Sequence, residues 1–479
     1  MRRGSLTVFF SLILTIILSL VLTLVEGARA GAVRMRLEIV SDIAMNSVLA
    51  EYNRELLRQY DLLFVDTAYG DGAPDLGKTE QHLQSYLNRN LAAPEGLEAW
   101  GTRDFVSLSL AGADITDAAY ASDGNGEVLL SQIRDYMDTT LVGMCESAIG
   151  DLLSDFVNSG IPDDPFTEIR NSNQAFLDGV EIPPQEVEPG VYEEVPLNNP
   201  ADGINSIRGI GILRFVRGQN EISDVQVDLN QYISHREINE GSGLCDQERE
   251  VSIPCNDLQL HSYLLEKCGC FGDEKEDSLL QYEREYLIKG YDTDWKNLEE
   301  VCKTLVFWRE VANCFYLFSD SEKIAEAEAM AAVLTAILLV PELLEPVKIS
   351  ILFAWAYLES LQDVRIMLNG GRVPLLKDAS TWKTSLLSIL NPAGSLSDEA
   401  GGEGLSYQDY LQIMLFLTPR SEKVWRLMDI IEMDVRKIPG YAGMMLDHCI
   451  HNYEATICVN SNFGGHAEIT RRYGYYYYK

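Results

Sequence analysis

The strongest constraint in this sequence is an uncharged, apolar segment close to its N-terminus. No residue from Ser5 to Val25 carries a charge, and Arg2 and Arg3 precede the segment. As an α-helix that rises about 1.5 Å per residue, this stretch is roughly 30 Å long, which matches the hydrocarbon core of a bilayer. The sequence therefore predicts a transmembrane helix over residues 5–25, preceded by a short tail at residues 1–4.

A cleavable signal peptide is the alternative for the same segment. The tripeptide Ala28-Arg29-Ala30 resembles a cleavage site, although the apolar segment exceeds the roughly 7–15 residues usual for signal peptides. Apolar residues also continue at helical steps of three or four: Val33, Leu37, Val40, Ala44, Val48, Tyr52 and Leu56. We therefore favour a retained anchor, with an amphipathic continuation of the helix over residues 26–60 that packs on a globular body.

Positive charges near the predicted span do not decide its orientation. Arg2 and Arg3 favour a cytoplasmic N-terminus, whereas Arg29, Arg34 and Arg36 after the span favour the opposite orientation. The count of positive charges on the two sides of the span therefore does not distinguish the two topologies.

One face of the predicted span carries small, hydroxyl-bearing residues. They recur every four positions, at Ser11, Thr15, Ser19 and Thr23. Such residues permit close approach of a second helix in a membrane, although a lipid-facing or mixed surface has the same composition. At the end of the span, Glu26 has the spacing to pair with Arg29, or with an arginine of a neighbouring helix.

The charge balance excludes one broad class of function. The 479 residues include 38 Lys and Arg against 73 Asp and Glu, for a net charge of −35. A surface this acidic repels nucleic acid and anionic lipid, so we expect no nucleic-acid partner. Because 46 % of the residues are hydrophobic, the chain can still bury sizeable cores.

The cysteines do not form a recognisable metal or disulfide framework. There are nine, an odd number, so at least one has no disulfide partner within the chain. The nearest approach to a metal set comprises Cys245, Cys255, His261, Cys268 and Cys270. This set lacks the paired C-x-x-C spacing of structural zinc sites, so we expect disulfides or buried thiols and no metal.

A second group of histidines and cysteines lies near the C-terminus. His448 and His451 flank Cys449, and Cys458 and His466 follow. On a strand His448 and His451 point to opposite faces, whereas Cys449 and His451 share one face. No oxyanion site, G-x-S-x-G or H-E-x-x-H motif accompanies them, so we expect no catalytic residues and no enzyme.

One motif suggests nucleotide binding. Residues Gly72–Thr79 match the phosphate-loop pattern G-x-x-x-x-G-K-[ST], between an apolar run and a helix-like run. Its candidate nucleotide-binding residues are Gly72, Gly77, Lys78 and Thr79. Asp75 inside the loop would repel phosphates, and the strand–helix alternation of a parallel sheet is absent. We therefore interpret the motif as a turn and expect no cofactor.

The remaining pattern predicts an α+β body that is mostly helical. We expect a mixed region over residues 61–160 and a Pro/Asp-rich loop or linker over 161–206. A β-hairpin at 207–229 would open a helical core that extends to residue 445. A second hairpin is expected over 446–479, with a turn at 462–465.

Several segments resemble a known but uncharacterised family. The segments are RRGSLTVFFSLILTIILSLVLTLVEGARA, ISHREINEGSG (Ile233–Gly243), REYLIKGYDTDWKNLEEV (Arg284–Val301), the stretch Leu338–Leu375 and the final RRYGYYYY. They are similar to membrane-anchored Gram-positive proteins linked to tight-adherence (Tad, or Flp) pili, which carry a TadE/TadG-like N-terminal helix. The resemblance implies a cytoplasmic N-terminus and an extracellular body. Unlike major pilins, the chain has no Glu at the fifth position after Gly4.

Together these features predict a non-enzymatic, single-pass membrane protein. The resemblance implies a pseudopilin-like role, as a minor pilin-like or assembly-associated component of a Tad-type pilus or secretion system. Its partners would be the lipid bilayer and other Tad pilin-like or assembly proteins. A surface adhesion module unrelated to pili is the first alternative. A nucleotide-binding protein that uses Gly72–Thr79 is the remote one.

Overall fold

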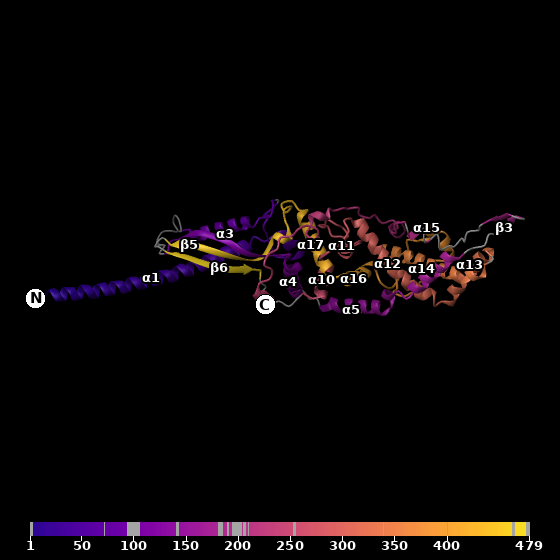
Figure 1. The fold of residues 1–479 in the computed structure, drawn as a ribbon, viewed down its shortest axis with the longest axis horizontal. Helices are drawn as coiled ribbons and strands as arrows, with labels where there is room; N and C mark the ends of the chain where they lie inside the picture. The colour runs from indigo at the N-terminus through magenta and orange to yellow at the C-terminus, as the bar shows by residue number, and fades with distance from the viewer. Residues whose placement is uncertain are drawn as a thin grey trace. The chain divides into compact units, whose positions relative to one another are not determined.

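The structure is a computed structural model that divides the chain into two compact units. The first unit comprises Met1–Thr139, Asn230–Cys255 and Ile431–Lys479, and the second comprises Thr140–Leu229 and Asn256–Ile430. Figure 1 labels their helices and strands. The described residues are 3–70, 72–92, 106–139, 143–180, 185–188, 191–193, 204, 207–208, 210–251, 255–338, 340–399, 401–461 and 465–475.

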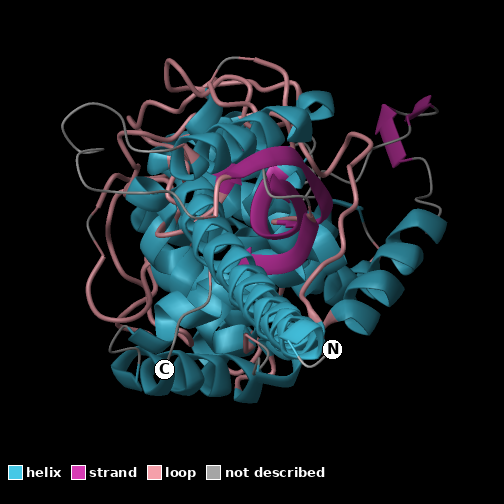
Figure 2. Ribbon diagram, turned by 90° about the vertical axis from the view of Figure 1, so that its left-hand side faces the viewer, coloured by secondary structure: helices cyan, strands magenta, loops and turns pink. Residues whose placement is uncertain are grey.

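An antiparallel sheet with β5 (Cys449–Ser461) as its central strand organises the first unit. β2 (Leu108–Tyr120) pairs with one edge of β5, and β6 (His466–Gly474) pairs with the other. The two-residue strand β1 (Val65–Asp66) pairs with the start of β5. Register shifts interrupt β2 at three places, and such irregularities increase the bend and twist of a sheet. Figure 2 shows the resulting strong curvature.

Alternation along β5 separates a buried face of this sheet from a polar face. Tyr453, Ala455, Ile457 and Val459 are buried, whereas the residues between them are partly exposed. Successive side chains of a strand point to opposite faces, so these four line one face. The second half of α1 and the helix α3 (Leu76–Leu91) contribute to the same hydrophobic core. The predicted C-terminal hairpin is confirmed, although most of its predicted turn lies outside the described residues.

The N-terminal helix α1 runs without interruption from Arg3 to Leu49, over 47 residues. It ends earlier than the predicted limit near residue 60. Asn53 caps a separate helix, α2 (Arg54–Tyr60), because its side-chain oxygen accepts the main-chain N–H groups of Glu55 and Leu56. The amphipathic pattern therefore continues across two helices rather than one.

Asp123 ties the sheet to a distant loop of the first unit. It begins α4 (Asp123–Thr139), whose first turn contains three residues with positive φ angles. The Asp123 carboxylate accepts N–H groups from Tyr120, Gly241 and Gly243 at 2.8–2.9 Å. A Cβ atom on Gly241 would lie 2.3 Å from the Ala118 carbonyl oxygen, so only glycine fits this close approach.

The second unit is predominantly helical. Its longest helices are α12 (Asp294–Leu317), α13 (Ser321–Leu338) and α14 (Leu344–Leu368), and both α12 and α13 pack on α14. α14 is buried along most of its length, including Trp355. Other helices of this unit include α5 (Gly143–Asn158), α8 (Leu213–Val216), α10 (Asp257–Lys267), α11 (Glu283–Lys289), α15 (Pro392–Ser395) and α16 (Tyr407–Leu417). α17 (Arg420–Arg436) contributes residues to both units, and α9 (Asp246–Val251) belongs to the first.

Two sequence-based expectations for the second unit are wrong. Instead of the predicted hairpin at 207–229, the described residues of this segment contain α8 (Leu213–Val216), and Gln226 forms an isolated bridge with Thr293. Leu213 and Val216 are both fully buried, and their spacing of three fits one helical face as well as an apolar strand. The mostly helical α+β class, with a long N-terminal helix, is nevertheless confirmed.

The predicted linker at 161–206 also contains regular structure. It includes the helix α6 (Thr167–Gly179) and the small hairpin β3 (Gln185–Glu188) and β4 (Val191–Glu193). Asn173 of α6 donates hydrogen bonds to Pro346 O at 3.1 Å and to Ser350 Oγ at 3.0 Å. These contacts with α14 explain why a proline- and aspartate-rich stretch still forms an ordered helix.

Candidate functional site

The two halves of α1 have opposite environments. Exposed apolar side chains between Leu6 and Val25 each keep 43–66 % of their surface. Farther along the same helix Leu37, Ala44 and Val48 are buried in the core of the first unit. Among the described residues, this is the one helix long and apolar enough to cross a membrane, with a mean hydropathy of 2.9. A single-pass anchor and a signal sequence are both compatible with it.

The hydroxyl groups on the exposed half of α1 bond to the main chain of their own helix. The oxygen–oxygen distances are 2.9 Å from Ser11 to Val8, 2.7 Å from Thr15 to Ser11, 2.8 Å from Ser19 to Ile16 and 2.7 Å from Thr23 to Ser19. The face therefore presents small side chains whose polar groups are already satisfied, which suits an apolar environment. The predicted pair at the end of the span is present, with Arg29 3.8 Å from Glu26.

Side chains from the C-terminal strands hold the second half of α1. Tyr453 donates to Met45 O at 3.0 Å, Tyr473 donates to Asp42 Oδ1 at 2.5 Å, and Tyr475 donates to Leu49 O. Arg471 on β6 also pairs with Glu38 at 3.5 Å. In the described part of the tyrosine-rich C-terminus, Tyr473 and Tyr475 thus pack against α1. Residues 476–479 lie outside the described residues.

The phosphate-loop look-alike is a turn stabilised by its own residues. Asp75 caps α3 and accepts the Gly77 N–H at 2.8 Å. Lys78 Nζ donates to two main-chain carbonyls, Ala68 O at 3.0 Å and Ala73 O at 2.8 Å. Thr79 is fully buried beside Tyr69, with 3.3 Å between the two hydroxyl oxygens.

The surroundings of this turn also differ from those of a nucleotide-binding loop. The preceding strand β1 is two residues long and pairs antiparallel with β5, whereas the phosphate loop follows a strand of a parallel sheet. A Cβ on Gly443 would lie 2.0 Å from Gly72 O, so main chain covers the first glycine of the motif. The contacts within this turn therefore explain the structural roles of its four candidate residues without a bound phosphate: Gly72, Gly77, Lys78 and Thr79.

His451 belongs to a buried hydrogen-bond network. Gln132 Nε2 lies 2.9 Å from Nδ1, and Glu248 Oε1 lies 3.0 Å from Nε2. Because the amide nitrogen can only donate, Nδ1 accepts and Nε2 carries the proton that is donated to Glu248. Burial raises the pKa of Glu248, but the contact with His451 lowers it and the net direction is downward. Both ring nitrogens are occupied, so His451 has no free nitrogen with which to activate Cys449.

Within the described residues, the first candidate set does not form a group of three ligands close enough to share one metal ion: Cys245, Cys255, His261, Cys268 and Cys270. Burial raises the pKa of Cys270 and Cys449 well above that of a free thiol. Burial also lowers the pKa of His261 to about 4, so its ring is neutral at physiological pH.

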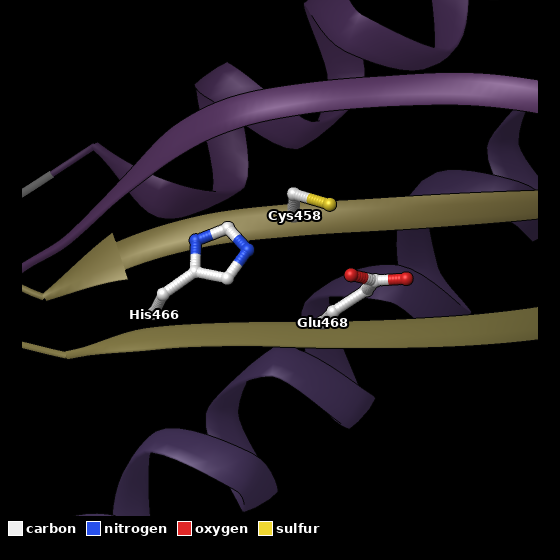
Figure 3. Close-up of side chains that lie close together, drawn as sticks. All are labelled: Cys458, His466 and Glu468. Atoms are coloured by element: carbon white, nitrogen blue, oxygen red, sulfur yellow. The ribbon is translucent and has the colours of Figure 1, made fainter.

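A different set of metal-ligating side chains does converge, on the hairpin of β5 and β6. Cys458 on β5 lies opposite Glu468 on β6, and His466 precedes Glu468 by two residues (Figure 3). One ligand atom from each residue lies within 4.8 Å of the other two, and this is the one such group among the described residues. Sequence reasoning noted Cys458 and His466 but missed Glu468, because its position depends on the strand register.

Comparison with known proteins assigns the chain to a family. Residues 190–461, more than half of the chain, match the family described as "Family of unknown function (DUF5702)". No curated protein and no solved structure matches the chain. This match assigns no chemistry, and it lies C-terminal to the exposed half of α1. The chain is a member of this family of unknown function, DUF5702.

Proposed function

We propose that this protein is a non-enzymatic, single-pass membrane protein with its body outside the cytoplasm. Its role would be that of a minor pilin-like or assembly-associated component of a Tad-type pilus or secretion system. The division of α1 into an exposed apolar half and a buried half carries this proposal. The exposed half suits lipid or neighbouring helices, while the buried half joins the anchor directly to the body.

The continuity of α1 supports a retained anchor. The helix passes through Ala28-Arg29-Ala30 without a break, and the described residues leave no extended segment there for a peptidase to enter. A membrane span that continues as a core helix also couples the body firmly to whatever the span contacts. A linker of flexible residues would lack this coupling.

The composition of the span supports association with similar helices. Ser11, Thr15 and Ser19 leave small side chains on one face, and small residues allow helix backbones to approach closely in a membrane. The resemblance of this segment to TadE/TadG-like N-terminal helices is the reason to propose pilus-related partners rather than unrelated ones.

The contacts of the candidate catalytic groups support a non-enzymatic role. Lys78 is engaged by two main-chain carbonyls, and His451 is bonded at both ring nitrogens. Neither side chain has the free, positioned atom that a phosphate contact or a general base requires.

A protease-protection experiment tests the topology, and copurification tests the role. Protoplasts of a Gram-positive host expressing the full chain are treated with external protease, with a cytosolic protein as the control. We expect the body to be digested while the control survives, and Tad pilin-like proteins to copurify from detergent extracts. A protected body would overturn the proposed topology. A digested body without pilin-like partners would instead favour a surface adhesion module.

A further inference from the structure

The outward face of the β5–β6 hairpin is a ladder of polar cross-strand pairs. Thr456 and Thr470 lie opposite each other, with their hydroxyl oxygens 2.9 Å apart. Farther along the same face, Arg472 pairs with Glu454 at 3.8 Å and also with Asp117 of β2. The opposite face of β6 packs Ala467 and Ile469 against the core. Side chains on the outward face therefore meet one another and solvent rather than the core.

Cys458, His466 and Glu468 occupy the end of this ladder nearest the hairpin turn. The register pairs Cys458 with Glu468, and it pairs His466 with Asn460, two residues after Cys458. Because side chains alternate along a strand, all three ligand-bearing residues project from one face. The register of the antiparallel ladder thus brings a thiol, an imidazole and a carboxylate together, without a loop that must fold around them.

The separation of the three ligand atoms suits a tetrahedral ion. Zinc binds sulfur at about 2.3 Å and nitrogen at about 2.0–2.1 Å, so two ligands of one ion lie roughly 3.5 Å apart. The three ligand atoms of Cys458, His466 and Glu468 all lie within 4.8 Å of one another, so each separation exceeds that in a zinc site by at most little more than 1 Å. His466 and Glu468 are exposed and Cys458 is partly exposed, so side-chain rotation can close the difference without backbone movement.

The His466 ring is already oriented for coordination. Its Nδ1 lies 3.3 Å from Asn460 Oδ1, and because this oxygen can only accept, Nδ1 carries the proton. Nε2 then has the free lone pair, and Figure 3 shows a ring nitrogen turned toward Cys458 and Glu468. Histidines that bind metals usually donate their other N–H to an oxygen in this way, which fixes the tautomer and the ring orientation.

The surroundings favour a cation and leave space for it. Gly112 of β2 lies opposite Cys458, and a Cβ placed there would meet no atom within 4 Å. Burial raises the pKa of the Cys458 thiol, and the negative charges of Glu468 and Asp114 raise it further. A bound cation would reverse this effect, because its positive charge stabilises the thiolate beside the carboxylates. The net charge of −35 also attracts cations to the protein surface.

We propose that Cys458, His466 and Glu468 bind one divalent cation of the zinc class, with water at the fourth coordination position. A thiolate, an imidazole and a carboxylate match the ligand preferences of zinc, whereas magnesium and calcium prefer oxygen alone. Binding replaces the thiol proton with a metal–sulfur bond and releases that proton to solvent. Because Cys458 lies on β5 while His466 and Glu468 lie on β6, the ion would crosslink the two strands and stabilise this end of their pairing.

Cobalt substitution tests this site in the intact protein. The full chain is purified in detergent, freed of metal and titrated with Co²⁺, which reports thiolate ligation by a sulfur-to-cobalt charge-transfer band. We expect saturation at one Co²⁺ per chain, tetrahedral ligand-field bands, and full displacement by Zn²⁺. A wild-type protein without the charge-transfer band would overturn the proposal, and this measurement needs no variant to fold.

Matched variants then assign the ligands. Cys458→Ser should abolish the band, and His466→Gln and Glu468→Gln should each lower Zn²⁺ affinity by about 100-fold or more. Thr470→Ala, on the same face of β6, and Cys245→Ser, at another partly exposed thiol, should leave binding unchanged. Circular dichroism verifies that each variant is folded. A band that survives in Cys458→Ser, or disappears in Cys245→Ser, would place the ion elsewhere and refute the assignment.

Discussion

Tyr453 donates a hydrogen bond from its phenol to the main-chain carbonyl of Met45, 3.0 Å away, and so joins the central strand to α1. Both side chains are fully buried in the first unit. Burial raises the pKa of Tyr453 far above its ordinary value, so the phenol stays protonated and remains a donor. Through this contact the long N-terminal helix is tied to β5.

Removing this hydroxyl should loosen α1. We expect Tyr453→Phe to lower the free energy of unfolding by about 1 kcal/mol, the usual net contribution of a buried neutral hydrogen bond. Hydrogen exchange should show faster exchange in the Ala44–Leu49 segment of α1. Tyr441→Phe, at a partly exposed tyrosine of the same unit, is the control and should leave that segment unchanged. Equal exchange in Tyr453→Phe and wild type would show that the bond is not stabilising.

The small-residue face of α1 should be the side that meets other helices. Ser19 and Val21 lie at nearly the same depth in the predicted span but on roughly opposite faces. In an otherwise cysteine-free chain, we expect Ser19→Cys to form crosslinked species in membranes, while Val21→Cys stays monomeric. Crosslinking is read on non-reducing gels. Equal yields from the two positions would identify the hydroxyl face as lipid-facing.

Glu285 should make the second unit less stable as the pH rises. The side chain is fully buried, and it accepts bonds from Phe271 N at 3.0 Å and Tyr407 Oη at 2.7 Å. Burial raises its pKa from 4.5 to about 7. The folded protein therefore binds more protons than the unfolded chain between these values, so stability is greatest below about 4.5 and falls until about 7.

Glu285→Gln isolates this effect, because the amide keeps an acceptor oxygen but does not titrate. The difference in unfolding free energy between wild type and variant should change by on the order of 3 kcal/mol between pH 4 and pH 8, in favour of the variant at pH 8. Urea unfolding at several pH values measures it. A difference that stays constant with pH would show that Glu285 has an ordinary pKa.

A buried ion cluster should be essential for the helical core. Arg309 of α12 lies 3.0 Å from Asp363 of α14, and both side chains are fully buried. Lys377 also pairs with Asp363, at 2.5 Å, and with Glu359. We expect Asp363→Asn to lower the free energy of unfolding by about 3–5 kcal/mol, because it leaves two buried cations with one carboxylate.

An exposed ion pair provides the matched control for this cluster. Lys383 and Glu399 lie 3.6 Å apart, with 42 % and 58 % of their side chains exposed. Glu399→Gln should change the stability by less than about 0.5 kcal/mol, because solvent screens the pair. Thermal or urea unfolding compares the two variants. Similar effects would contradict the assignment of the buried cluster as the more important one.

Lys78 should stabilise the turn at Gly72–Thr79 and should not bind nucleotides. Because its amine holds two carbonyls of the preceding loop, Lys78→Met should destabilise the first unit by about 1–2 kcal/mol. Binding of labelled ATP should be undetectable in both proteins. Saturable ATP binding by wild type that disappears in Lys78→Met would restore the nucleotide-binding alternative.

Some features of this protein followed from sequence because they depend on residues close together in the chain. The absence of charge from Ser5 to Val25 indicates a long apolar helix whatever the rest of the chain does. The spacing of Glu26 and Arg29 produced the local pair that the structure contains. The two C-terminal strands were also predictable, since β-preferring residues flank a glycine-rich turn.

Other features depended on partners that are distant in sequence. Leu213 and Val216 form a helix where a hairpin was expected, because a short apolar run suits either structure until its burial partners are known. Asn173 lies in a stretch read as a linker, and its contacts with α14 are 173 and 177 residues away in the chain. Local propensity could not supply these contacts.

The sequence by itself determined the apolar span, the acidic surface and the mostly helical composition, since each follows from residue type and short-range period. Tertiary structure alone decided that the second half of α1 would be held by Tyr453 and that Lys78 would be bound by carbonyls. It also decided that Glu468 would face Cys458, because the register of two strands sets which side chains meet across them. The candidate metal site exists only at that level, where pairing brings together residues whose spacing carries no motif.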